Sequence, residues 1–110
     1  GGSDLQIYMT RVTGGGWDIA SGKTLGSVTL NTWNHFVVTR NGTTFTAYKN
    51  NTQTDTWQSS GVLGASALPL TFGKYVSTTP YWYKGKLDDV HIYSRALSAA
   101  EVKQLYNLGR

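Results

Sequence analysis

The chain has 110 residues, a length that predicts one domain with a single hydrophobic core. It contains no cysteine, which excludes disulfides, thiol catalysis and thiolate metal sites. Its net charge is +4, but the basic residues are scattered along the chain, so we do not expect a nucleic-acid-binding protein. No apolar run approaches the ~20 residues of a membrane span.

Alternating apolar and polar residues, rich in β-branched and aromatic types, predict a mostly β chain. Turns are predicted at Thr13–Gly16, Ser21-Gly22, Asn41-Gly42 and Asn50-Asn51, and the Asn-Gly pair favours a type I′ hairpin. No signal peptide is recognised, and Gly1–Ser3 is interpreted as a tag or linker remnant. The predicted strands are, in chain order, Leu5–Val12, Trp17–Ala20, Val28–Leu30, Trp33–Arg40, Thr43–Lys49, Thr52–Gln58, Leu70–Tyr75 and Tyr81–Tyr83.

The segment Gly85–Val102 predicts a last strand followed by a helix. Its first half alternates like a half-buried strand. Leu87 and Val90 are an odd number of positions apart, so a β-bulge at Asp88-Asp89 is predicted, which would turn both side chains toward the core. Ser98 and Glu101 form a capping-box pattern, and Gly109 ends the helix, which we expect to pack on the last strand. The predicted core comprises Phe36, Val38, Phe45, Phe72, Leu87, Val90 and Ile92.

Four segments carry a family resemblance. G-K-L-D-D-V-H-I-Y-S-R-A-L-S-A-A-E-V at Gly85–Val102 and T-W-N-H-F-V-V-T-R-N-G at Thr32–Gly42 resemble the laminin-G-like, concanavalin A-like lectin/glucanase superfamily. T-A-Y-K-N-N at Thr46–Asn51 and L-T-F-G at Leu70–Gly73 fit the usual order of that family. The resemblance covers roughly residues 28 to 108. It implies an all-β, antiparallel jelly-roll β-sandwich with a short C-terminal helix, forming one laminin-G-like domain over residues 1–110.

The resemblance also implies a module, outside the cell or at its surface, that binds glycans or proteins. Members of the superfamily are usually longer, with further strands before the piece that Leu5–Val12 matches. The chain is therefore a fragment, an unusually small sandwich, or a domain whose missing strands come from a partner. An open sheet edge invites pairing with another chain, so we hypothesise a homodimer.

Catalysis is not expected. A glycan hydrolase needs two carboxylates ~5–10 Å apart across the scissile bond. Asp88 and Asp89 are adjacent on a predicted strand and point to opposite faces, and the E-x-D-x-x-E motif of the superfamily's glucanases is missing. The resemblance implies that Asp88, Asp89 and Arg95 form a structural, buried polar clamp at the strand–helix corner.

No metal site is assigned. His35 and His91 lie in predicted strands without a second ligand at metal spacing. Ca²⁺ is implied by resemblance only, since many superfamily members hold it at one rim of the sandwich. The loop oxygens that could contribute are those of Asp18, Asn50, Asn51 and Asp55, and turn formation explains the asparagines better.

The aromatic residues give the functional hypothesis. Tyr81, Trp82 and Tyr83 stand in a row where a strand begins, so at least one ring faces outward. Exposed rings stack on the apolar faces of sugars. The candidate ligand-binding residues are Trp82, Tyr81, Tyr83, Tyr75, Trp57 and Lys84. In the alternative interpretation Trp33 and Trp57 belong to the core and Tyr81–Tyr83 close the end of the sandwich. The two functions kept open are a non-catalytic carbohydrate-binding module and a structural or adhesion module that binds protein, including itself.

Overall fold

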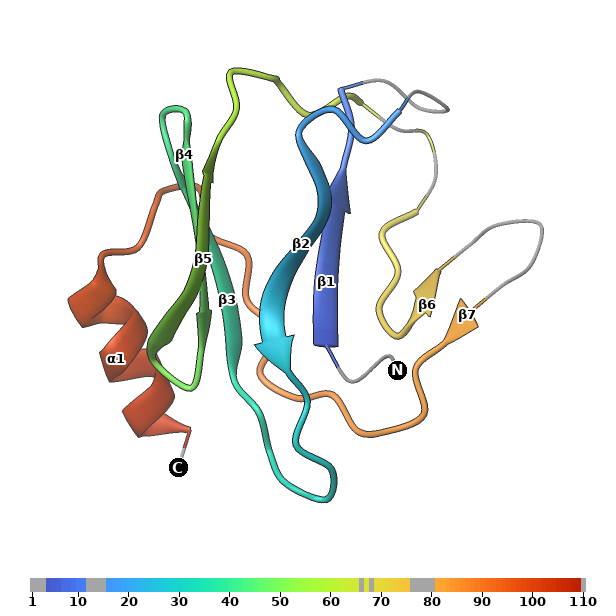
Figure 1. Ribbon diagram of the computed structural model, residues 1–110. Coiled ribbons are helices and arrows are strands. Elements are labelled where there is room, and N and C mark those ends of the chain that lie inside the picture. The colour runs from blue at the N-terminus through green and yellow to red at the C-terminus, as the bar shows by residue number, and fades with distance from the viewer. Residues whose placement is uncertain (1–3, 12–15, 66, 68, 76–80, 110) are drawn as a thin grey trace.

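The computed structural model describes residues 4–11, 16–65, 67, 69–75 and 81–109. In this part the chain is mostly β, with antiparallel sheets in the orders β1-β2, β3-β4-β5 and β6-β7 and a C-terminal helix, α1. The elements are β1 (Asp4–Met9), β2 (Ala20–Ser27), β3 (Phe36–Asn41), β4 (Thr44–Lys49), β5 (Thr52–Gln58), β6 (Lys74–Tyr75), β7 (Tyr81–Trp82) and α1 (Ala99–Leu108). The β1-β2 sheet lies between the three-stranded sheet and the β6-β7 hairpin, and α1 covers the opposite side of the three-stranded sheet (Figure 1).

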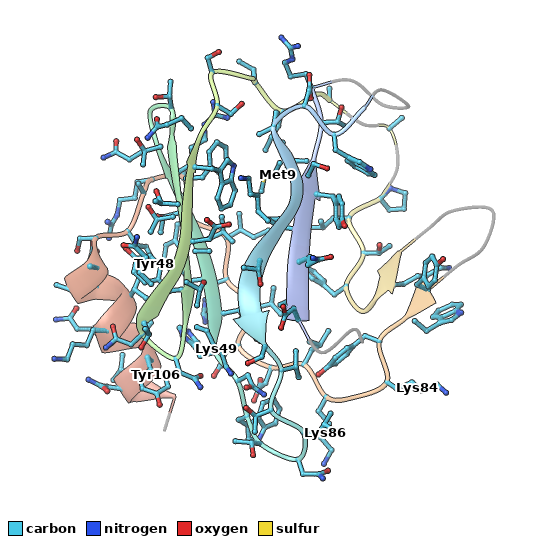
Figure 2. All side chains as sticks on the ribbon, viewed as in Figure 1. Met9, Tyr48, Lys49, Lys84, Lys86 and Tyr106 are labelled. Carbon is cyan, nitrogen blue, oxygen red and sulfur yellow. The ribbon has the colours of Figure 1, made fainter. Side chains whose placement is uncertain are left out.

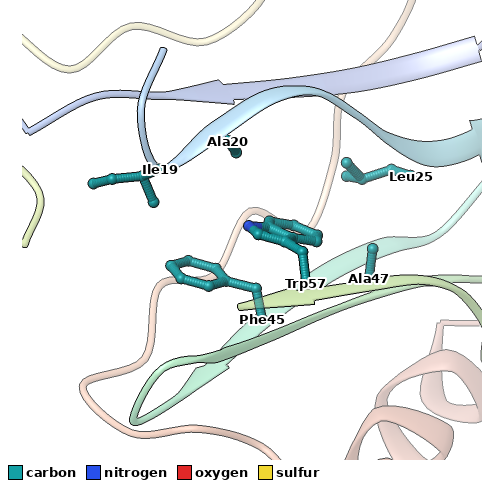
Figure 3. Close-up of a cluster of buried hydrophobic side chains, with 6 residues drawn as sticks. All are labelled: Ile19, Ala20, Leu25, Phe45, Ala47 and Trp57. Carbon is teal, nitrogen blue, oxygen red and sulfur yellow. The ribbon is translucent and has the colours of Figure 1, made fainter. Parts of the chain in front are cut away.

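The core lies between the β1-β2 and β3-β4-β5 sheets (Figure 3). Its buried members are Ile19, Ala20, Leu25, Phe45, Ala47 and Trp57. Phe45 and Trp57 are directly opposite in the β4-β5 ladder, and their rings stack with centroids 5.1 Å apart. Phe36 and Val38 pack against this cluster, which confirms three predicted core residues together with Phe45. The pleat explains the arrangement, because every second residue of a strand faces the same layer.

The N-terminal hairpin is confirmed, but its second strand is displaced: β2 begins at Ala20, where the predicted strand Trp17–Ala20 ends, and residues 17–19 form no strand. β2 runs straight through the expected break at Ser21-Gly22. The register shifts there, and Gly22 has a φ of 60°, so the two residues form a bulge that keeps the strand paired. Glycine tolerates this conformation without strain. Residues 28–30, in contrast, form no strand.

Two tight turns set the register of the three-stranded sheet. Asn50 and Asn51 both have positive φ, 47° and 68°, between paired strand ends, which is the type I′ pattern. The other turn differs from the prediction by one residue. Asn41 pairs with Thr44, so Gly42 and Thr43 are central, and positive φ at Gly42 fits type II′ instead of type I′.

The helix begins and ends as predicted. Glu101 N donates to the Ser98 side chain and Ser98 N to the Glu101 carboxylate, which completes the capping box. Gly109 N donates to the carbonyl of Leu105 at the C-terminal end. The helix does not pack on a last strand, however. It lies against the outer face of the three-stranded sheet, where Tyr106 contacts His35 with ring centroids 6.0 Å apart.

The main correction concerns residues 70–95. Residues 85–93 form no strand, so the bulge predicted at Asp88-Asp89 is absent, although Asp89 does have positive φ. β6 covers only Lys74–Tyr75 instead of Leu70–Tyr75. Four predicted core residues, Phe72, Leu87, Val90 and Ile92, are each more than half exposed. The sheets are small and open, and the turns predicted at 13–15 and the loop at 76–80 lie outside the described residues.

Candidate functional site

The β6-β7 hairpin presents three aromatic residues to solvent. Lys74 pairs with Trp82 across the two strands, and Tyr83 N donates to the carbonyl of Gly73 to extend the pairing by one step. The exposed fractions of Tyr81, Trp82 and Tyr83 are 67%, 63% and 52%. We call the surface formed by these three residues and Lys74 the aromatic edge. In the described part of the chain, therefore, none of the three rings is buried in the core.

Lys74 positions the indole of Trp82. Its ammonium nitrogen lies 4.7 Å from the ring centroid, within the range of a cation–π contact. Both residues belong to the same strand pair, and Trp82 remains 63% exposed beside the ammonium group. The pairing of Lys74 with Trp82 could not be predicted from the sequence, because cross-strand neighbours depend on the register of the two strands.

Gly85 allows Tyr83 to fold back toward the chain. A Cβ at position 85 would lie 2.7 Å from the Tyr83 ring, closer than real contacts permit. The glycine thus keeps space for the phenol, and a larger residue would displace it. This requirement was missed because a glycine beside an aromatic run is also an ordinary turn residue.

The other predicted ligand-binding residues lie in different places. Trp57 is only 7% exposed and belongs to the core, so it cannot extend the aromatic edge. Trp33, the other tryptophan assigned to the core in the alternative interpretation, is 65% exposed. Lys84 is exposed next to the aromatic edge, on the side of the molecule away from Tyr48 and Tyr106 (Figure 2). Tyr75 is a strand residue of β6, but its side chain lies outside the described part.

The predicted clamp of Asp88, Asp89 and Arg95 is wrong. All three residues are exposed, and Asp88 accepts a hydrogen bond from the adjacent backbone N–H of Asp89. Arg95 instead makes a bidentate pair with Glu101, with Nη1 donating to Oε1 at 2.9 Å. The hydrogen bond from Arg95, aided by the backbone of Ser98, lowers the pKa of Glu101 to about 2. Arg95 therefore binds Glu101, because the capping box holds this carboxylate in place six residues further along the chain.

The remaining titratable groups of the described residues are engaged in separate places. Within the described residues no three His, Asp or Glu side chains could hold one ion. Asp18, a predicted loop oxygen donor, pairs with the side chain and backbone N–H of Arg11, which lowers its pKa. Asn50 accepts a hydrogen bond from His35 N at 2.9 Å and so serves the fold. The Nδ1 atom of His35 is buried and has no hydrogen-bond partner among the described residues, and burial lowers the pKa of this imidazole.

Comparison with known proteins identifies the family. Residues 1–103 match the family model described as the concanavalin A-like lectin/glucanases superfamily, and the chain belongs to this superfamily. The family implies a β-sandwich, of which the described residues form small open sheets. No helix in the described part is long and apolar enough to cross a membrane.

A solved structure is also similar. It is a crystal structure of an S-layer domain-containing protein from Clostridium thermocellum, with 25% sequence identity and a TM-score of 0.59. The alignment covers 79% of this chain and 48% of the S-layer protein chain, so this chain spans about half the length of its structural relative. A search of curated proteins gives no match.

Proposed function

We propose that this chain is a non-catalytic carbohydrate-binding module that uses the aromatic edge. The observation that carries the proposal is the exposure of Tyr81, Trp82 and Tyr83 together on one short hairpin. Aromatic rings left in water are costly unless a ligand covers them, and the C–H faces of sugar rings match their flat surfaces. Membership of a lectin-containing superfamily agrees with this assignment without fixing the sugar.

Lysine side chains supply the polar half of the proposed site. Lys74 lies over Trp82, and Lys84 follows Tyr83 directly in the chain. Ammonium groups donate hydrogen bonds to sugar hydroxyls, or to the carboxylate of an acidic sugar. The proposed ligand is thus a glycan that stacks on Trp82 and is oriented by Lys74 and Lys84.

Catalysis has no part in the proposal. Asp18 and Glu101 are engaged with arginines, and Asp88 and Asp89 are adjacent on an exposed segment. We further propose that the module works at the cell surface as part of a larger jelly-roll sandwich. The support is the likeness to an S-layer domain-containing protein whose chain is about twice as long as the aligned part.

A glycan array with matched tryptophan variants tests the proposal. Trp82→Ala should reduce binding at least about tenfold, because a lost stacking contact of about 1.4 kcal/mol corresponds to that factor. Trp33→Ala is the control, since Trp33 is equally exposed but lies outside the aromatic edge. Running the array with calcium present and with calcium chelated tests the metal expectation. Equal loss in both variants, or a silent array, would contradict a site at the aromatic edge.

A second candidate function is a structural or adhesion module that associates with another copy of itself. The observation in its favour is the row of exposed apolar residues in 70–93, which includes Leu70, Phe72, Leu87, Val90 and Ile92. Leu70 and Phe72, and likewise Val90 and Ile92, are two residues apart, a spacing that suits a strand that pairs when a partner edge is supplied.

Light scattering tests this second function. We expect a concentration-dependent dimer, and Ile92→Lys should return it to a monomer because a charge cannot be buried unpaired at the interface. Gln104→Lys, on the exposed part of α1, is the control. A monomer mass at every concentration would exclude self-association.

A further inference from the structure

The outer face of the three-stranded sheet carries polar rows that the aromatic edge does not explain. Thr39, Thr46 and Thr56 are directly opposite one another on β3, β4 and β5. Asn41, Thr44 and Gln58 form the next row. Because Phe45 and Ala47 face the core, the side chains of the residues between and beside them on β4 point to the other face of the sheet, where α1 lies.

A groove of about 420 Å³ lies along this face. Its floor is formed by Thr39, Asn41, Thr44 and Thr46, and its wall by residues 96–99 before and at the start of α1. Sites of this size take small molecules, and groups fixed on strands hold their positions better than groups on loops. Figure 1 shows that α1 and the β6-β7 hairpin lie on opposite sides of the molecule, so the groove is separate from the aromatic edge.

The polar groups of this floor differ in what they already bind. Thr56 donates its hydroxyl to the carbonyl of Phe45, and Thr44 exchanges hydrogen bonds with Gln58. The hydroxyls of Thr39 and Thr46 and the amide of Asn41 make no hydrogen bond with any described residue. Each of these three groups can both donate and accept, so they remain able to bind a ligand that does the same.

Charge decides the class of ligand. Glu101 is the charged side chain that borders the groove in the described part, and its carboxylate is engaged by Arg95 and the N–H of Ser98. An anion would therefore meet no free cation, and a cation would meet a carboxylate that is already neutralised. The methyl and methylene groups of Ala96 and Leu97 offer an apolar wall opposite the hydroxyl floor.

We propose that this groove is a second binding site, for a neutral, hydroxyl-rich ligand of the saccharide class. Thr39, Asn41 and Thr46 hydrogen-bond to its hydroxyls, and Ala96 and Leu97 contact its C–H face. The inference goes beyond the proposed function, because this site needs neither Trp82 nor the exposed segment 70–93.

The test is a titration followed by the backbone amide signals of the protein in NMR. Cellobiose and N-acetylglucosamine are the neutral probes, and inorganic phosphate is the charged probe. We expect saturable shifts at residues 39–46 and 96–99 with at least one sugar and none with phosphate. Absence of such shifts with both sugars, or tighter binding of phosphate, would overturn the proposal.

Threonine-to-valine variants assign the binding to the groove floor. Valine keeps the shape and the strand preference of threonine and removes only the hydroxyl. The double variant Thr39→Val/Thr46→Val should bind the sugar about tenfold more weakly, which two ordinary hydrogen bonds account for. Thr56→Val lies in the same row outside the groove and should bind like the parent. Equal affinity of the double variant and the parent would overturn the assignment.

Trp82→Ala separates this site from the aromatic edge. We expect the variant to keep the sugar-induced shifts in the groove, whatever it does to array binding. Loss of array binding with a silent groove would leave the aromatic edge as the sugar site and overturn the inference. Groove shifts with an array unaffected by Trp82→Ala would overturn the aromatic-edge function and leave the groove site standing.

Discussion

The three-stranded sheet and the segment 70–95 both alternate apolar and polar residues, but only the sheet buries its apolar side chains. In the three-stranded sheet Phe45 is 2% exposed and faces β2, whereas Phe72 in the 70–95 segment is 55% exposed. β4 has a hydrogen-bonded strand on each side and a second sheet against its apolar face. Residues 85–93 have no ladder partner among the described residues. Alternation therefore tells which residues share a face, but burial also needs a layer opposite that face.

The largest expected effect on the free energy of unfolding is the difference between Phe45→Ala and Phe72→Ala. Phe45→Ala should lower the free energy of unfolding by about 3–5 kcal/mol, because it leaves a cavity beside Trp57 in the closed core. Phe72→Ala should lower it by less than about 1 kcal/mol, since more than half of the ring is already in water. Urea denaturation followed by tryptophan fluorescence measures both.

Equal losses in the two variants would break the comparison. They would mean that residues 70–75 pack as firmly in solution as β4 does. If the loss in Phe72→Ala grew with protein concentration, the ring would instead be buried between copies, as the second proposed function requires.

The sequence predicts well the elements that depend on neighbours in the chain. The β3-β4-β5 meander has short loops rich in Asn and Gly, and local turn chemistry predicts the pairing of Lys49 with Thr52 correctly, although the turn after β3 is shifted by one residue. Ser98 and Glu101 likewise form their capping box within one helical turn. These predictions are confirmed because no distant contact is needed.

Contacts between distant segments were not predictable in the same way. Arg95 had two apparent partners, Asp88 and Asp89, and binds Glu101 because the helix fixes that carboxylate. The place of α1 on the three-stranded sheet and the separation of Trp57 from Trp82 also depend on how the layers stack. The candidate site was therefore found in part, through its consecutive aromatic residues. The ligand-binding use of Tyr81–Tyr83 stays a prediction until binding is measured.

A smaller effect on the free energy of unfolding is expected at the helix cap, which forms through contacts within one helical turn. Ser98→Ala should lower the free energy of unfolding by about 1 kcal/mol, because the backbone N–H of Glu101 loses its acceptor. Ser94→Ala, in the exposed segment before the helix, is the control and should change it by less than about 0.5 kcal/mol. Circular dichroism during urea denaturation gives both values. A cost at Ser94 as large as at Ser98 would show that the segment 85–95 is itself ordered by side-chain contacts.

The smallest expected effect is the pH dependence of stability due to His35. This residue directly precedes β3, and its pKa also depends on Asp89 of the exposed segment. Burial lowers the pKa of this imidazole below 6.5, and the negative charge of Asp89 in the exposed segment partly opposes that shift. The unfolded chain therefore binds more protons, so the free energy of unfolding should fall as the pH drops through 6.5 toward the lower folded-state value. His35→Gln should remove this contribution, and His91→Gln, an exposed histidine, should leave it in place. Asp89→Asn should make the fall steeper, because it removes the charge that favours the protonated ring.

Denaturation midpoints of the four proteins between about pH 5 and 8 measure the difference. An unchanged slope in Asp89→Asn would mean that the exposed segment does not stay beside the sheet in solution.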